Sequence, residues 1–240
     1  MYLPPFPVLG GLLAWATVYF IGFKRTQWGD FLLGLAAFLL AMVVQSPVQQ
    51  LPLIGMGIQK NADIVARGTV FIVGTALWVG LVAGFVQEGV KYFLVKDKST
   101  RTAFFVGLGF GITEVVFVTV APIIAVASVG GTLNVPLIQA LLSLIERYSA
   151  VLFHIGTTVF LAYAARKGFG RWGFLSMAVL HGFVDSLATY IQLLSIENDK
   201  LAMKFAPGFE ALFGLIAIVL IAYTLPLARI EKPEEEKMIW

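Results

Sequence analysis

Residues 68–95 read GTVFIVGTALWVGLVAGFVQEGVKYFLV, an apolar stretch in which Glu88 is the first charged residue. A helix needs about 20 predominantly apolar residues to cross the hydrocarbon core of a bilayer. Residues 68–87 meet this requirement without one charged side chain. The stretch therefore predicts a membrane-spanning helix, and this helix also carries two ionisable residues, Glu88 and Lys91.

The composition of the whole chain predicts the same class of protein. Of 240 residues, 59% are hydrophobic and 13% are charged, and the mean hydropathy is +0.88. An average soluble protein carries about 25% charged residues, so this chain has too little polar surface for a soluble domain of its length. We predict an all-α, polytopic transmembrane helix bundle in contact with lipid. It forms one domain over residues 1–230, followed by a short acidic cytoplasmic tail, residues 231–240.

Seven spans are predicted along the chain. They lie near residues 5–23, 31–48, 68–95, 102–128, 134–165, 172–195 and 205–228. The first has no basic residues before it and no small-residue cleavage pattern after it, so it is interpreted as a retained helix rather than a signal peptide. Pro52, Gly55 and Gly57 interrupt the polar segment Gln49–Arg67. We expect this segment to be interfacial or re-entrant rather than a full span.

The distribution of cations predicts the orientation. Eleven lie on one side of the predicted spans: Lys24, Arg25, Lys96, Lys98, Arg101, Arg166, Lys167, Arg171, Arg229, Lys232 and Lys237. Four lie on the other: Lys60, Arg67, Lys200 and Lys204. Lysine and arginine concentrate in cytoplasmic loops, so the N-terminus is expected outside and the C-terminus in the cytoplasm. This topology accounts for the net charge of +3, and no nucleic-acid partner is expected.

Eight acidic, basic or histidine residues fall inside the four predicted spans between residues 68 and 195. They are Glu88, Lys91, Glu114, Glu146, Arg147, His154, His181 and Asp185. An Asp, Lys or Arg side chain at mid-bilayer costs about 2.5–3.5 kcal/mol on insertion scales, so such residues indicate a functional site. Four of them, from four spans, lie about 12–20 Å from the same membrane face at ~1.5 Å per residue. This layer consists of Glu88, Glu114, His154 and His181.

Two imidazoles and a carboxylate form a known catalytic zinc set, and a second carboxylate can take the proton of the activated water. The chain has no cysteine, which excludes thiolate ligands. It has no His-Glu-x-x-His motif, and Asp185 is the only Asp within a predicted span, which excludes an aspartyl dyad. Asp185 follows His181 by four residues, so it is expected either to accept a hydrogen bond from that imidazole or to join the ligands.

Three other features of these spans predict contacts between helices or side chains. Lys91 follows Glu88 by three residues and either pairs with it or extends to the cytoplasmic surface. Glu146 and Arg147 are sequence neighbours that point in different directions around the helix, and they serve either in structural pairing or as the outer lining of a cavity. The Gly107/Gly111 spacing favours close helix packing, which would let Glu114 approach a neighbouring helix.

Four fragments carry a resemblance to a known family. They are Gln87-Glu88-Gly-Val-Lys91-Tyr92, Gly107-x-Gly-x-Gly-x-x-Glu114, Glu146-Arg147…Phe153-His154 and His181-Gly-Phe-Val-Asp185. In this order they resemble the PrsW/YhfC branch of the intramembrane metalloproteases, which are related to type II CAAX prenyl proteases and bacteriocin-processing proteins. The resemblance covers roughly residues 80–190.

This resemblance implies a zinc protease of a prokaryotic cytoplasmic membrane that cuts a membrane protein or peptide. His154 and His181 would be metal ligands, and Glu114 a ligand or water-positioning residue. Asp185 would be the partner of His181, and Lys91 matches the basic end of the first motif. Gln87 replaces a family glutamate, and an amide cannot act as a general base. Either Glu88 takes that role, or the chain is a non-cleaving relative, or the glutamine is an engineered substitution.

Three other interpretations of the polar layer stay open. Buried ion pairs and histidines can simply hold helices together. The same residues suit a transporter or a proton- or ion-binding protein, although no inverted repeat is visible. A catalytically inactive scaffold that binds membrane helices is the third. The sequence predicts neither the substrate nor the oligomeric state.

Overall fold

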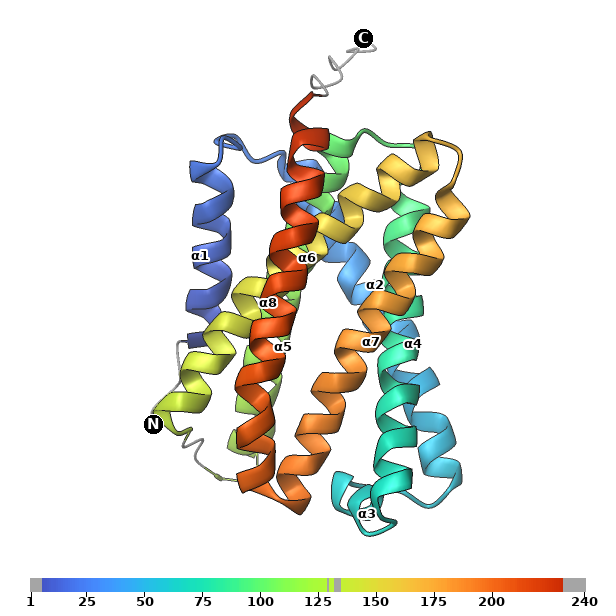
Figure 1. Cartoon of the computed structure of the whole chain (residues 1–240), viewed down its shortest axis with the longest axis vertical. Helices are drawn as coiled ribbons and strands as arrows, with labels where there is room; N and C mark the ends of the chain where they lie inside the picture. The colour runs from blue at the N-terminus through green and yellow to red at the C-terminus, as the bar shows by residue number, and fades with distance from the viewer. Residues whose placement is uncertain (1–5, 129, 132–134, 231–240) are drawn as a thin grey trace.

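The computed structural model describes residues 6–128, 130–131 and 135–230 (Figure 1). Within these residues the secondary structure is entirely helical. The helices are α1 (Phe6–Phe20), α2 (Trp28–Gly55), α3 (Asn61–Val65), α4 (Thr69–Val95), α5 (Thr100–Ser128), α6 (Leu137–Arg166), α7 (Gly170–Glu197) and α8 (Asp199–Ile230). The long helices run along one common axis, and α6 crosses the bundle obliquely (Figure 1).

Six of the described helices are long and apolar enough to cross a membrane: α2, α4, α5, α6, α7 and α8. Each has 27 to 32 residues, whereas the apolar helix α1 has only 15. The predicted helical membrane bundle is confirmed, and the described residues hold six candidate spans and one shorter apolar helix where seven spans are predicted. The predicted acidic tail, residues 231–240, lies outside the described residues.

Most of the described lysines and arginines lie in or near the segments that connect the helices, at the two ends of the bundle. The end of α8 lies at the same end as the segments 21–27, 96–99 and 167–169, and α1 runs toward that end (Figure 1). Lys232 and Lys237 lie outside the described residues, but the other cations of the larger group fall near these segments. The predicted orientation relative to the membrane stays a prediction.

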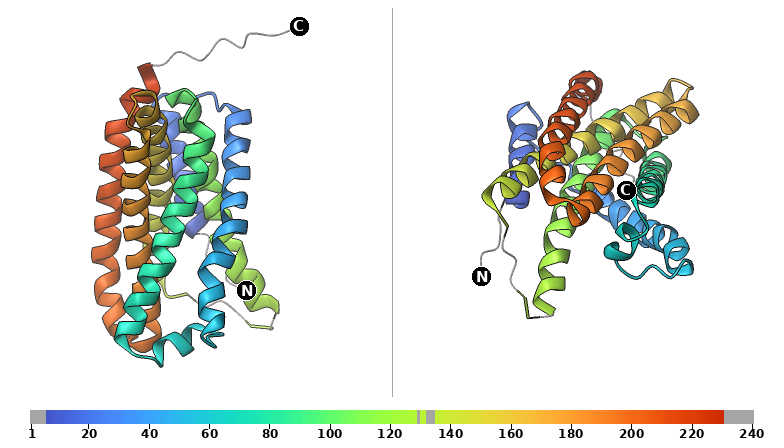
Figure 2. Two further views of the ribbon diagram at one scale, coloured as in Figure 1. Left: turned by 90° about the vertical axis from the view of Figure 1, so that its right-hand side faces the viewer. Right: turned by 60° about the horizontal axis from the view of Figure 1, so that its bottom comes forward.

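Helix α2 extends into the segment Gln49–Arg67, which forms no separate span, and the interfacial or re-entrant position of this segment stays a prediction. Helix α2 continues through Pro47 and Pro52 and ends only at Gly55. A proline removes a single backbone donor, and neighbouring helices and local adjustments let membrane helices tolerate it. The chain turns at Gly57, whose φ of +76° favours glycine, and α3 then links α2 to α4 at that end of the bundle (Figures 1 and 2).

A carboxylate fixes the start of α3. Backbone N–H groups of Gln59 and Lys60 donate to Asp63 Oδ2 at 2.9 and 3.0 Å. These two bonds favour the ionised form and hold the pKa of the exposed Asp63 carboxyl below its usual value. The link between the two spans is therefore an ordered turn.

Glycines bring the central helices into close contact. A methyl group at Gly84 of α4 would lie 2.8 Å from Gly182 Cα of α7, closer than van der Waals contact allows. On α5, a methyl group at Gly107 or Gly111 would lie 2.7 or 2.9 Å from a Cα atom of α6. The expected role of Gly107 and Gly111 in helix packing is thus confirmed. Helix α6 is the most enclosed span, with 78% of its apolar window buried.

Candidate metal centre

Three helices meet at a buried group of two histidines and one glutamate. Glu88 of α4, His154 of α6 and His181 of α7 each offer one potential ligand atom, and these atoms lie within 4.8 Å of one another. All three side chains are buried, and Glu88 Oε2 has no hydrogen-bond partner. A buried carboxylate oxygen without a donor is costly, and a cation would satisfy it. Two imidazoles and a carboxylate therefore fit a zinc ion.

The glycines of the helix contacts position these side chains. Glu88 lies one turn beyond Gly84, on the face of α4 that packs against α7, and His181 directly precedes Gly182. Glu114 lies one turn beyond Gly111 in the same way, on the α5 face that packs against α6. Helices without side chains at the contact approach closely, and the next turn then brings its long polar groups together.

Lys91 lies at the centre of this group and pairs with Glu88 rather than extending to the membrane surface. Its ammonium donates to Glu88 Oε1 at 2.6 Å, to Thr157 Oγ1 at 2.8 Å and to His154 Nδ1 at 3.1 Å. These three bonds use all the donors of an ammonium group. Because Lys91 can only donate, His154 Nδ1 is an acceptor, so Nε2 carries the ring proton and donates to Glu114 Oε2.

A chain of partly buried ion pairs runs outward from Glu114. Arg147 donates from Nη1 to Glu114 Oε1 at 2.7 Å and from Nη2 to Glu146 Oε1 at 2.6 Å. Glu146 and Arg147 are found in both of the expected arrangements, because they form ion pairs and also line a small cavity. Their side chains do not diverge, since the long guanidinium group reaches the carboxylate of its sequence neighbour. His154, Glu114, Arg147 and Glu146 thus form one continuous network.

Glu88, rather than Asp185, orients the imidazole of His181. His181 Nδ1 and Glu88 Oε1 are 2.6 Å apart, whereas His181 Nε2 and Asp185 Oδ2 are 3.6 Å apart, too far for a hydrogen bond. The i+4 spacing places Asp185 beside the ring, as expected, but its side chain is 34% exposed and faces a cavity.

Gln87 lies apart from the histidines. Its buried side-chain nitrogen donates to Gln45 Oε1 of α2 at 3.0 Å, and its own oxygen has no hydrogen-bond partner. Gln87 and Glu88 are neighbours on a helix, so they face different directions: Glu88 faces α6 and α7, and Gln87 faces α2. Of the residues predicted for the site, Gln87 is the one that the structure does not bring to the histidine pair.

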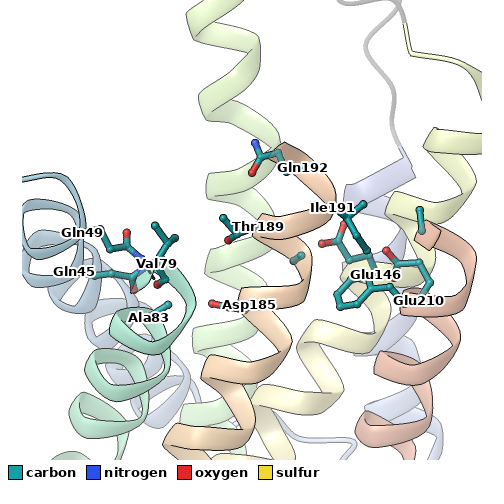
Figure 3. Close-up of a pocket in the computed structure, with 13 residues that line it drawn as sticks. Gln45, Gln49, Val79, Ala83, Glu146, Asp185, Thr189, Ile191, Gln192 and Glu210 are labelled. Atoms are coloured by element: carbon teal, nitrogen blue, oxygen red, sulfur yellow. Dashed lines mark hydrogen bonds between the residues drawn. The ribbon is translucent and has the colours of Figure 1, made fainter. Parts of the chain in front are cut away.

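Two cavities adjoin the site on the side of the histidines that faces away from Glu88 and Gln87. A small one of about 60 Å³ is lined by Glu114, His154, His181 and Asp185, together with Glu146 and Arg147. A larger one of about 440 Å³ shares four lining residues with it, including Glu146 and Asp185 (Figure 3). Neither Glu88 nor Gln87 lines either cavity. The cavity side therefore exposes the imidazoles, Glu114 and Asp185.

The sequence-based site lacks several polar residues of these surroundings, among them Gln45, Thr157 and Glu210. Glu210 of α8 lines the larger cavity and is the only charged residue within the predicted span 205–228, so its position alone could have revealed it. Gln45 and Thr157 are uncharged residues among many in the spans. Only the packing of α2 against α4, and of α6 against Lys91, shows their contacts.

Comparisons with known proteins bear on part of this site. Residues 130–205 match the model of the YhfC intramembrane metalloprotease family. No curated protein and no solved structure matches the chain. The matched segment contains α6 and α7, and so His154, His181, Glu146, Arg147 and Asp185, but not Glu88 or Glu114. Over this segment the chain is similar to a family of membrane-embedded metalloproteases.

Proposed function

We propose that this protein is an intramembrane zinc protease that hydrolyses a peptide bond of a membrane-associated protein or peptide. The observation that carries this proposal is the buried Glu88, His154 and His181 group inside a bundle of apolar helices. Both histidines lie in the segment that is similar to the YhfC metalloproteases. The proposal includes the wider kinship with PrsW and CAAX prenyl proteases, and a prokaryotic cytoplasmic membrane as the location.

Glu88, His154 and His181 are the residues that would hold the metal ion. A zinc ion supplies Lewis-acid chemistry: it activates water and polarises a carbonyl group. Lys91 acts as a positioning residue, because it fixes one oxygen of Glu88 and one nitrogen of His154. This leaves Glu88 Oε2 as the atom without a partner. His154 Nε2 donates to Glu114 and would have to release its proton to bind a metal ion.

The difference in exposure to the cavity assigns different roles to Glu88 and Glu114, one as a metal ligand and the other as the general base. Glu88 is fully buried and lines neither cavity, whereas the Glu114 side chain is 17% exposed and lines the small one. A general base must reach the water whose proton it accepts. We therefore assign the base to Glu114, which Arg147 and His154 hold in place, and assign to Asp185 the positioning of the substrate amide in the cavity.

Metal content tests the proposal directly. We expect the purified protein to hold about one zinc ion per chain by mass spectrometry of the metal. The His154→Ala/His181→Ala double variant should hold none. Absence of zinc from the native protein after incubation with Zn²⁺, or its retention in the double variant, would reject the metal centre.

Cleavage of a transmembrane peptide tests the role of Glu114. Glu114→Gln should lower kcat by about 10²–10⁴-fold, the usual contribution of a general base, and should leave zinc bound. Glu197→Gln is the matched control, since it makes the same change at an exposed residue at the end of α7. Equal activity of Glu114→Gln and Glu197→Gln would contradict the assignment.

One contact favours a second candidate, a metal-free scaffold that binds membrane helices. The Lys91 ammonium donates to two of the three proposed ligands and supplies positive charge beside the position of a metal ion. A scaffold would capture a transmembrane peptide without zinc and without product. The protease requires both, so metal content and product formation separate the two candidates.

A further inference from the structure

Glu210 of α8 is a buried carboxylate that the proposed reaction does not use. It is 8% exposed, and its Oε2 atom has no hydrogen-bond partner. Glu210 lines the cavity of about 440 Å³ that adjoins the histidine site. A carboxylate inside an apolar helix is costly unless it is paired, so its unpaired oxygen marks a position for a ligand that donates hydrogen bonds.

The same cavity collects two further carboxylates. Glu146 of α6 and Asp185 of α7 also line it, and no lysine or arginine is among the described lining residues. Figure 3 shows Glu146 beside Glu210, and Asp185 on the helix between them and the glutamines of α2. The nearby Arg147 donates to Glu114 and Glu146, and Glu210 Oε2 receives no bond. The cavity therefore favours a cation.

The distances between these carboxylates indicate whether the cavity suits a metal ion or a larger organic cation. A metal ion needs several ligand atoms close together. Among the described residues, only Glu88, His154 and His181 form a group of three or more acidic or histidine side chains with ligand atoms within 4.8 Å of one another. Glu146, Asp185 and Glu210 form no such group, so they are too widely spread to chelate a metal ion together. They surround a space that admits a larger cation, and ammonium and guanidinium groups suit such a space because they donate several hydrogen bonds.

We propose that Glu210, with Glu146 and Asp185, forms a subsite for a cationic group of the substrate. This inference rests on the proposed protease function and narrows its substrate class to membrane-associated peptides with a lysine, an arginine or a free amino group near the cleaved bond. The two cavities share Glu146 and Asp185 as lining residues, so a cation held by Glu210 lies next to the space where the histidines face the substrate.

A pair of small probes tests the subsite without catalysis. 4-Aminobenzamidine is a cation, and 4-aminobenzamide is a neutral molecule of nearly the same shape. Loss of one charged hydrogen-bond partner should weaken binding of the amidine to Glu210→Gln by roughly tenfold or more. Binding to Glu197→Gln should be unchanged. Equal binding of the two probes by the native protein, or equal binding of the amidine by native protein and Glu210→Gln, would overturn the subsite.

Peptide cleavage then identifies the source of the cation. The measurement compares kcat/KM for four transmembrane peptides. Two carry lysine or arginine, and two carry norleucine, one of these with a free amino terminus and the other with a blocked amino terminus. We expect about tenfold faster cleavage of at least one cationic peptide than of the blocked norleucine peptide. Glu210→Lys should reverse this order in favour of a glutamate peptide, which also shows that the variant is folded. Equal rates for all peptides would reject the inference, whereas selective amidine binding without any cleavage would reject the protease and leave the subsite standing.

Discussion

At the scale of single residues, the Lys91 ammonium stabilises the centre of the site only because its surroundings supply acceptors. A buried charge loses its hydration, and its pairing must replace that loss. Glu88, His154 and Thr157 provide one acceptor for each N–H donor. The neutral Thr157 matters as much as the charged partner, because loss of its oxygen leaves one donor of a buried cation unsatisfied.

Thr157→Val tests this requirement, since valine keeps the shape of threonine and removes the hydroxyl. We expect a decrease of about 1.5–3 kcal/mol in the free energy of unfolding, the usual value for a hydrogen bond to a charged group. The measurement is unfolding in detergent, followed by circular dichroism. Thr158→Val is the control, because the buried Thr158 hydroxyl donates only to the His154 carbonyl of its own helix. Equal losses in the two variants would contradict the role of Thr157.

Gln87→Glu tests whether a carboxylate at position 87 supplies the base in this chain. Gln87 faces Gln45 of α2 and lines neither cavity, so a carboxylate there would lie away from the histidines. We expect no increase in peptide cleavage, and a lower Tm because the new charge is buried beside a single amide. A rise in kcat by orders of magnitude would show that position 87 provides the base and would displace Glu114 from that role.

At the scale of helices, the contacts that build the site are glycine contacts, and these can be changed without touching any polar residue. Gly84→Ala should push α7 away from α4, because its methyl group would overlap Gly182. Overpacking of this kind costs about 1–3 kcal/mol. Since His181 precedes Gly182 and Glu88 follows Gly84, we expect zinc content and Tm to fall together.

Gly74→Ala is the matched control in the same helix. A methyl group at Gly74 meets no other atom within 4 Å, so only the helix propensity changes, by about 1 kcal/mol in favour of alanine. Its Tm should stay the same or rise, with full zinc content. If Gly84→Ala kept both zinc and Tm, the α4–α7 contact would not position the ligands.

The regular repeat of the helix made much of this arrangement predictable from the sequence. A fixed rise per residue placed Glu88, Glu114, His154 and His181 at one depth, and the structure brings these four into one hydrogen-bonded network through Lys91. Direction around each helix was harder to predict. Helix periodicity alone cannot show that Gln87 faces α2, that Glu88 holds His181, or that the Arg147 side chain turns back to Glu146. Long side chains select partners that only tertiary packing supplies.

At the scale of the whole molecule, orientation decides from which side the cavities are reached. The loop 96–99 and the link containing α3 lie at opposite ends of the bundle (Figure 1). The excess of lysine and arginine at the first end predicts that it faces the cytoplasm. Asp185 lies one turn beyond His181 along α7, which runs away from that end, so the larger cavity lies toward the outer side of the predicted membrane.

The absence of cysteine makes this orientation directly measurable, because any introduced cysteine is the only thiol in the chain. Asn61→Cys and Asp97→Cys place one at exposed positions of the opposite ends, without altering a lysine or arginine that sets the topology. In intact cells a membrane-impermeant maleimide should label position 61, and it should label position 97 only after the membrane is opened. The reverse pattern would place the larger cavity on the cytoplasmic side and invert the predicted topology, and labelling of both positions in intact cells would exclude their location on opposite faces of the membrane.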